Sequence, residues 1–144
     1  MAGGQPRARS NAKVSLLNEP DSIRAVEREI LEAASTHGYP EAAQFAIRLA
    51  LEEAVFNAFR HGHKHLPDEP VLVDWTVSRG SVRIVVEDRG PGFTPDAVPD
   101  PTHEDRLELP HGRGVMLMKA YMTQVEYNDR GNRVTMVYQK PQDD

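Results

Sequence analysis

Two pairs of alternating segments constrain the fold of this chain more than any other feature. Residues 71–78 (VLVDWTVS) and 81–88 (SVRIVVED) form the first pair, and residues 124–129 (QVEYND) and 132–140 (NRVTMVYQK) form the second. Within each pair, an Arg-Gly dipeptide stands between the two segments. Apolar side chains at every second position are typical of strands, and a short link containing glycine is typical of a hairpin turn. The sequence therefore predicts two antiparallel hairpins.

The rest of the regular structure is expected to be mainly helical. Residues 18–38 and about 40–62 repeat apolar side chains at helical spacing, and the stretch GVMLMKAYM (114–122) predicts a third helix. A short strand is expected in KVSLL (13–17). This order of strand, two helices, hairpin, irregular stretch, helix and hairpin predicts one mixed α+β layer pair. We expect a single domain over residues 13–140.

The segments at the two ends and the helix boundaries follow from local composition. Residues 1–12 are small, polar and basic and are expected to be disordered, and residues 141–144 form a polar tail. Asp21 or Ser22 is expected to cap the first helix, which Gly38 ends. Pro40 fits the first turn of the second helix, because an N–H is not needed there.

The composition of the chain excludes some kinds of site and disfavours one class of function. Hydrophobic residues make up 39% and charged residues 27% of the 144 residues, which is an ordinary globular balance. The chain has no cysteine, so disulfides and thiolate metal sites are excluded. A net charge of -5 disfavours a general nucleic-acid binder, which needs a basic face for phosphates. With no long apolar run and no signal-peptide pattern, a cytoplasmic protein without a membrane segment is expected.

The stretch LEEAVFNAFRHGH (51–63) places a polar column on an otherwise apolar helix. Glu53, Asn57 and His61 are four residues apart and share one helix face. Glu52 points well away from this column, and Arg48 is its expected partner at i, i+4. The amide oxygen of Asn57 suits a hard cation such as Mg²⁺, and a carboxylate at Glu53 can accept a proton from an attacking hydroxyl. A partly solvated polar stripe is the alternative interpretation.

Two glycine-containing stretches also bear on chemistry. In VVEDRGPGF, Asp88 ends a strand and is followed by Gly90 and Gly92, which let the backbone approach a flat ligand closely. Asp88 can accept a hydrogen bond from an exocyclic amine such as that of adenine. In HGRGVMLMKAYM, Gly112 and Gly114 precede an apolar helix, whose first N–H groups can bind an anion. A tight turn and a flexible helix start are the plain structural alternatives.

Between these two stretches lies a long irregular segment rich in proline and acidic residues. Residues 89–113 show no sustained periodicity. Loops of this length are uncommon in small domains and often act as lids over functional sites. We expect residues 94–111 to form such a lid.

The order of these stretches resembles that of a known superfamily. EAVFNAFRHGHK, EDRGPGF, DPT…GRGVMLMKAYMTQVEY and NRVTMVYQK are similar to the boxes of the GHKL ATPases, and more narrowly to the RsbW and SpoIIAB group of anti-sigma-factor serine kinases. The resemblance covers residues from about 12 to 140. It implies the Bergerat fold, an α+β two-layer sandwich. Its mixed, mostly antiparallel sheet would be covered on one face by about three helices.

The resemblance also implies roles for individual residues. Glu53 matches the general base and Asn57 the Mg²⁺ ligand. Asp88 matches the acid that reads adenine, and Gly90 and Gly92 match the glycines that form the adenine wall. Gly112 and Gly114 match the phosphate-binding glycines. Thr135 matches a threonine near the acid that reads adenine. Arg113 either contacts a phosphate or is solvated, and His61 is expected to border the phosphates. His63 and His65 are expected to be surface residues.

The function implied by the resemblance is that of an ATP-dependent serine-protein kinase and anti-sigma factor. Such a protein holds a sigma factor inactive and phosphorylates a STAS-type antagonist, using ATP and Mg²⁺ and acting as a homodimer. The alternative is a nucleotide-sensing interaction module that binds ATP without transferring phosphate. Glu53 argues against this alternative, because a module that only binds has no need of a base.

Overall fold

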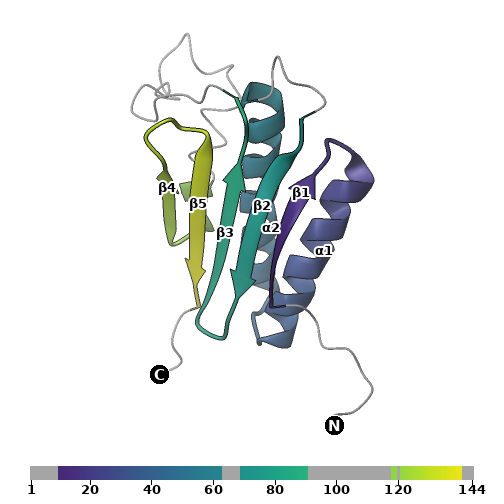
Figure 1. Cartoon of the computed structure of the whole chain (residues 1–144). Coiled ribbons are helices and arrows are strands. Elements are labelled where there is room, and N and C mark those ends of the chain that lie inside the picture. The colour runs from purple at the N-terminus through teal and green to yellow at the C-terminus, as the bar shows by residue number, and fades with distance from the viewer. Residues whose placement is uncertain (1–9, 63–68, 91–117, 120, 141–144) are drawn as a thin grey trace, which may run out of the picture.

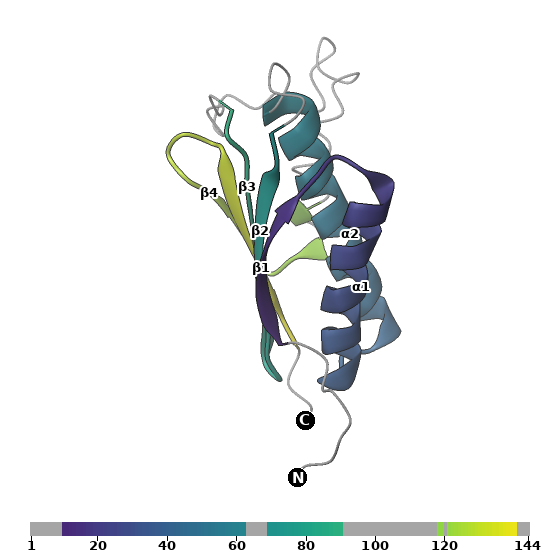
Figure 2. The same cartoon turned by 45° about the vertical axis from the view of Figure 1, so that its right-hand side comes forward.

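The computed structural model describes residues 10–62, 69–90, 118–119 and 121–140 of the chain. Within these ranges, five strands form one sheet, and two α-helices and a π-helical turn pack against it (Figures 1 and 2). The elements, in chain order, are β1 (Asn11–Leu16), α1 (Pro20–Thr36), α2 (Glu41–Asn57), η1 (Ala58–Gly62), β2 (Val71–Val77), β3 (Ser81–Glu87), β4 (Gln124–Tyr127) and β5 (Arg133–Gln139).

The sheet has the strand order β1-β2-β3-β5-β4, and every neighbouring pair is antiparallel. Both predicted hairpins are confirmed, β2 with β3 and β4 with β5. The sequence also predicted a two-layer α+β sandwich, and the described part of the chain has this architecture. The expected sheet was mixed, whereas its described strands are all antiparallel.

One face of the sheet is buried beneath the helices and the other is open. Trp75 pairs with Ile84, which in turn pairs with Met136, and all three side chains are fully buried. Leu72, one position away from a buried neighbour, is 39% exposed on the other face. Since strand residues alternate between faces, the apolar positions of β2, β3 and β5 form one continuous core with α1 and α2. Figure 2 shows α1 and α2 on the same side of the sheet.

The helix boundaries agree with the sequence in part. Gly38 follows α1 with φ 86, a conformation that glycine adopts without strain, so its predicted role is confirmed. The predicted cap is wrong, because α1 begins at Pro20 and its N-cap is Glu19, whose side chain makes no capping hydrogen bond to the described part of the helix. The fixed φ of proline suits the first helical position. Asp21 lies within the first turn and pairs with Arg24 at 3.1 Å.

Two further boundaries differ by a residue or two. Pro40 is the N-cap of α2, one position before its expected place in the first turn. β1 begins at Asn11, which pairs with Thr76, so the last residues of the expected disordered segment belong to the sheet. In the described ranges, no helix is both long enough and apolar enough to cross a membrane.

Several expectations fall outside the described residues. These are the surface positions of His63 and His65, the lid at 94–111, the start of the third helix and the C-terminal tail. Within the predicted third helix, Met118, Lys119 and Tyr121 are helical, and Met118 is fully buried.

Three described segments meet at one end of the molecule. The last turn of α2, the end of β3 and the turn between β4 and β5 all lie at the upper end in Figure 1. This end carries the residues from which the candidate site is built.

Candidate functional site

The polar column on α2 has the phase that the sequence predicted. Glu53 and Asn57 are one turn apart, and both are partly buried on the helix. Burial raises the pKa of the Glu53 carboxyl, and the negative charge of neighbouring Glu52 adds to the rise. A carboxylate with a raised pKa is a stronger proton acceptor, which suits the role of a general base.

Asn57 holds a polar group that its described surroundings leave unsatisfied. Both Nδ2 and Oδ1 of its amide are buried, and neither has a hydrogen-bond partner among the residues that the structure describes. A buried polar atom without a partner costs about 1–3 kcal/mol, so such an atom calls for an explanation. A ligand supplies one: Mg²⁺ prefers oxygen ligands such as an amide carbonyl. The residue therefore fits the metal-binding role that the resemblance implies.

The regular α-helix ends directly after Asn57. Residues Ala58–Gly62 form the π-helical turn η1, which includes His61. A π-helical turn is wider than an α-helical turn and occurs frequently at functional sites. The α-helical spacing that placed His61 in phase with Asn57 therefore stops at Asn57. The His61 side chain lies outside the described part, so its contact with phosphates stays a prediction.

Asp88 lies buried just beyond the end of β3. Its Oδ1 accepts a hydrogen bond from the N–H of Gly90 at 2.8 Å, which fixes the turn after the strand. Its own backbone N–H donates to the carbonyl oxygen of Asn132 at 2.8 Å. Asp88 is 8% exposed, so a hydrogen bond from a ligand to its carboxylate would be shielded from water. The structure thus holds Asp88 and Gly90 in one turn, and their roles in binding adenine stay predictions.

Asn132 is a neighbour of Asp88 that the sequence reasoning missed. Its Nδ2 donates to the backbone carbonyl oxygen of Asp88 at 3.1 Å. Its Oδ1 accepts from Nδ2 of Asn128 at 2.7 Å, and Oδ1 of Asn128 accepts from the Asn132 N–H at 3.0 Å. The turn between β4 and β5 is therefore tied to the end of β3. Two asparagines flanking Arg130-Gly131 were the available signal, because asparagine commonly bonds to nearby backbone groups in turns.

Thr135 is not the residue that accompanies Asp88. It pairs with Val85 of β3 and Glu126 of β4, and it borders a hollow of about 300 Å³ on the open face of the sheet. Its neighbours Val134 and Met136 point into the core on the helix side. The expectation that placed Thr135 near Asp88 is wrong for this reason: the alternation of β5 turns it to the other face.

Tyr127 approaches Asp88 from β4. It pairs with Val134, whose side chain faces the helices, so Tyr127 shares that face. Burial raises the pKa of its phenol, and the negative charge of Asp88 raises it further. The phenol therefore stays neutral and keeps its proton as a hydrogen-bond donor. Nothing in the spacing of the sequence pointed to this tyrosine.

The other predicted contacts lie outside the described residues. Gly92 and the glycines and arginine of the second glycine stretch, Gly112, Arg113 and Gly114, belong to this group. Their roles stay predictions.

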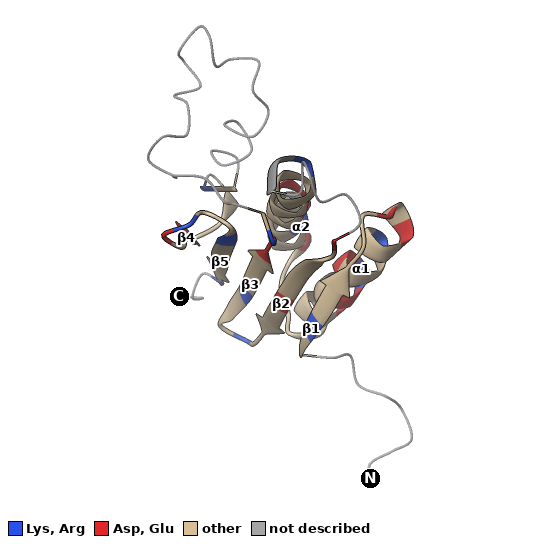
Figure 3. Ribbon diagram, turned by 45° about the horizontal axis from the view of Figure 1, so that its top comes forward, with Lys and Arg blue, Asp and Glu red and all other residues tan. Residues whose placement is uncertain are grey.

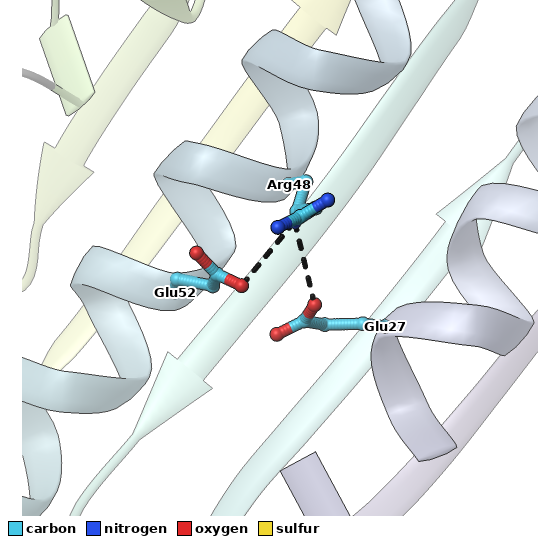
Figure 4. Close-up of polar contacts among 3 residues, drawn as sticks. All are labelled: Glu27, Arg48 and Glu52. Carbon is cyan, nitrogen blue, oxygen red and sulfur yellow. Dashed lines mark hydrogen bonds and ion pairs between the residues drawn. The ribbon is translucent and has the colours of Figure 1, made fainter. Parts of the chain in front are cut away.

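Glu52 has the partner that the sequence assigned to it. Its Oε2 lies 3.4 Å from Nε of Arg48, which confirms the i, i+4 pair. The same Nε lies 3.8 Å from Oε1 of Glu27 on α1, a contact between helices that the sequence did not predict (Figure 4). Glu52 thus faces α1, away from the column of Glu53 and Asn57.

Comparison with known proteins agrees with this geometry. The family model of the histidine kinase-like ATPase domain matches residues 16–138. The chain belongs to this family. An anti-sigma F factor from Geobacillus thermodenitrificans is 31% identical over 96 residues, covering 65% of this chain and 66% of that protein. An anti-sigma F factor from Clostridium perfringens is 28% identical over 96 residues, covering 65% of this chain and 69% of the relative.

A solved structure supports the fold of this family member. The crystal structure of the RsbU and RsbW domains of a Mycobacterium tuberculosis protein matches with a TM-score of 0.60 and 18% identity. The match covers 90% of this chain and 31% of that one.

The chain spans only about two thirds of the length of the anti-sigma F factors. The predicted resemblance to the RsbW and SpoIIAB group is confirmed.

Proposed function

We propose that the protein is an ATP-dependent serine-protein kinase and anti-sigma factor that phosphorylates a STAS-type antagonist. The observation that carries the proposal is the amide of Asn57, which is buried without a hydrogen-bond partner among the described residues, one turn after a carboxyl with a raised pKa. An ordinary solvated stripe would expose both groups, whereas the amide atoms of Asn57 are buried and Glu53 is partly buried. Together they suit a site that binds a cation and removes a proton.

The site residues that the structure describes each have a part in the proposed reaction. Asp88 accepts a hydrogen bond from the amine of adenine, while Gly90 lets the ring approach the backbone. The amide oxygen of Asn57 would hold Mg²⁺, which would supply positive charge to offset the negative charge of the phosphates. Glu53 takes the proton of the serine hydroxyl as its oxygen attacks the terminal phosphorus of ATP and ADP leaves. Phosphoryl transfer depends mostly on positioning and charge stabilisation. The general base is expected to raise the rate by a further factor of about 10²–10⁴.

The phosphates are proposed to bind at the second glycine stretch. The N–H groups near Gly112 and Gly114 would donate to phosphate oxygens at the start of a helix, with Arg113 between them. His61 and Gly92 complete the proposed contacts, near the phosphates and the adenine respectively.

The partners follow from the relatives. Because the similar proteins are named anti-sigma F factors, we propose a sigma factor as the protein held inactive. A STAS-domain antagonist would be the serine substrate, and the protein would act as a cytoplasmic homodimer without binding nucleic acid. Binding of ATP without transfer is the alternative function, and the raised pKa of Glu53 favours the kinase.

Two measurements on the same variants test the proposal. Glu53→Gln should keep most ATP affinity in a calorimetric titration and lose most phosphoserine formation, followed by mass spectrometry on a candidate STAS protein. Asn57→Ala should weaken Mg²⁺-dependent ATP binding itself. Glu52→Gln, assayed at pH 8, is the control for helix phase and should leave both nearly unchanged. Loss of transfer in Glu52→Gln but not in Glu53→Gln would contradict the assignment.

A further inference from the structure

A row of side chains crosses β4, β5 and β3 on the helix side of the sheet and leads toward Asp88. Tyr127 pairs with Val134, and Val134 pairs with Val86. Both valines are buried, and Tyr127 packs against the same hydrophobic core. Asp88 lies two residues beyond Val86, and its N–H still bonds to Asn132 of the neighbouring chain segment. Because alternation returns a side chain to the same face after two residues, Asp88 and Tyr127 share one side of the sheet.

The spacing of the strands lets the Tyr127 hydroxyl reach Asp88. Neighbouring strands lie about 4.8 Å apart, so β4 is about 10 Å from β3. A tyrosine side chain carries its hydroxyl at the far end of the ring and spans more than half of this distance, while the Asp88 side chain extends from the other side. Burial raises the pKa of the Tyr127 phenol, and the negative charge of Asp88 raises it further. The carboxylate therefore acts on this hydroxyl.

Hydrogen bonds in the turn between β4 and β5 hold the two residues in place. Asn128 follows Tyr127, and its Nδ2 donates to Oδ1 of Asn132 at 2.7 Å. Nδ2 of Asn132 in turn donates to the backbone carbonyl oxygen of Asp88 at 3.1 Å. Figure 3, with this end of the molecule turned toward the viewer, shows acidic and basic positions at the end of β3 and in this turn. A side chain on a backbone fixed in this way can support a ligand-binding group without rearrangement.

The Asp88 carboxylate can accept more than one donor. A carboxylate has about four acceptor positions, and the N–H of Gly90 occupies one of them on Oδ1. The resemblance placed a threonine hydroxyl near this acid, but Thr135 borders the hollow on the open face of the sheet. Its neighbour Val134, on the helix side, has no hydroxyl. Tyr127 brings a hydroxyl to this side of the sheet.

We propose that Tyr127 is a positioning residue for the adenine site, whose hydroxyl donates to the Asp88 carboxylate and keeps it directed at the adenine amine. The inference rests on the nucleotide site proposed above and adds a residue to it. A carboxylate that is already held by the protein loses less side-chain freedom when a ligand binds. Tyr127 would thus strengthen the preference for a purine that carries an amine, without touching the purine itself.

The test is calorimetry with the full chain and two ligands in the presence of Mg²⁺. One ligand is ADP, and the other is the diphosphate of purine riboside, which has the same ring system without the exocyclic amine. The parent should prefer ADP by at least about tenfold, since a hydrogen bond to a charged group is worth that factor. Tyr127→Phe removes the hydroxyl and keeps the ring, and it should reduce this preference by about fivefold. An equal loss of affinity for both ligands would mean that Tyr127 only packs, and it would overturn the proposal.

Tyr138→Phe is the matched control. Tyr138 lies on the helix side of β5 and also packs against the core, but it pairs with Val82, at the opposite end of β3 from Asp88. Its variant should keep the preference of the parent, and a similar reduction there would overturn the assignment to Tyr127. In an Asp88→Asn background, Tyr127→Phe should change the preference little, because no carboxylate is left to position. A full fivefold reduction in that background would contradict the proposal.

The parent protein separates this inference from the proposed function. No binding of ADP by the parent would overturn the nucleotide site and this inference together. Binding of ADP with an unchanged preference in Tyr127→Phe would overturn this inference alone. Urea unfolding of Tyr127→Phe checks that the variant is folded under the conditions of the titration.

Discussion

Replacing Glu27 by glutamine should stabilise the protein above neutral pH. In the folded protein, burial and Glu52 raise the pKa of Glu27 from 4.5 to about 7. Each unit of pKa corresponds to about 1.4 kcal/mol, so ionising this carboxyl in the folded state opposes folding by about 3 kcal/mol. The side chain is 12% exposed, so solvent screens little of this effect. Glutamine has nearly the same shape and carries no charge.

The sign of the effect fixes the pH window. A carboxyl with a raised pKa binds its proton more tightly in the folded than in the unfolded protein. Its favourable contribution is complete below about pH 4.5, falls as the pH rises and is lost above about pH 7. The free energy of unfolding of the variant relative to the parent should therefore rise across this window and level off near pH 8.

Urea unfolding between pH 5 and pH 8 measures this difference. Comparing the parent with Glu27→Gln at each pH removes the contribution of all groups that titrate equally in both proteins. Glu41→Gln, an exposed acid on α2, serves as the control and should show a flat difference. A difference for Glu27→Gln that is equally flat across the range would refute the argument that this carboxyl is buried at a cost.

Three further outcomes are expected. Asp88→Ala should weaken ATP binding by at least about tenfold, because a hydrogen bond to a buried charge is worth about 1.5–3 kcal/mol, and calorimetry on the parent should show that ATP binds more tightly than GTP. Glu52→Gln should move the acid limb of the phosphotransfer pH profile to lower pH, because the charge of Glu52 helps raise the pKa of Glu53; an unmoved limb would contradict this coupling. Asn132→Ala should lower both the free energy of unfolding, by about 1 kcal/mol, and the ATP affinity, whereas Thr135→Ala on the open face should leave the ATP affinity unchanged.

The parts of the fold that the sequence predicted are those with a strong local signal. Alternation in residues 71–88 and 124–140 predicted both hairpins, because one buried face imposes a period of two. Gly38 predicted the end of α1 because glycine adopts a positive φ without strain, and its φ in the structure is 86. The start of that helix was missed because Asp21 and Ser22 are residue types that commonly cap helices. In the structure, Pro20 occupies the first helical position instead.

The features that were missed depend on contacts between distant segments. Thr135 and Asn132 are three residues apart, and only the register between β3 and β5 decides which of them meets Asp88. The contact of Glu27 with Arg48 requires the packing of α1 on α2, which no local pattern encodes. The column of Glu53 and Asn57 was predictable because it lies within one helix, where spacing alone sets the face.

The position of β3 in the sheet has a consequence for how the chain opens. β3 is the central strand, hydrogen-bonded to β2 on one side and to β5 on the other. Strands with neighbours on both sides and buried side chains exchange their amide protons slowly, because they open only when the domain unfolds. Asp88 is attached to the end of this strand and is tied to β5 through Asn132. The residue proposed to read adenine is thus anchored to a strand that should exchange its amide protons slowly, and we expect Asp88 to be in place before a nucleotide arrives.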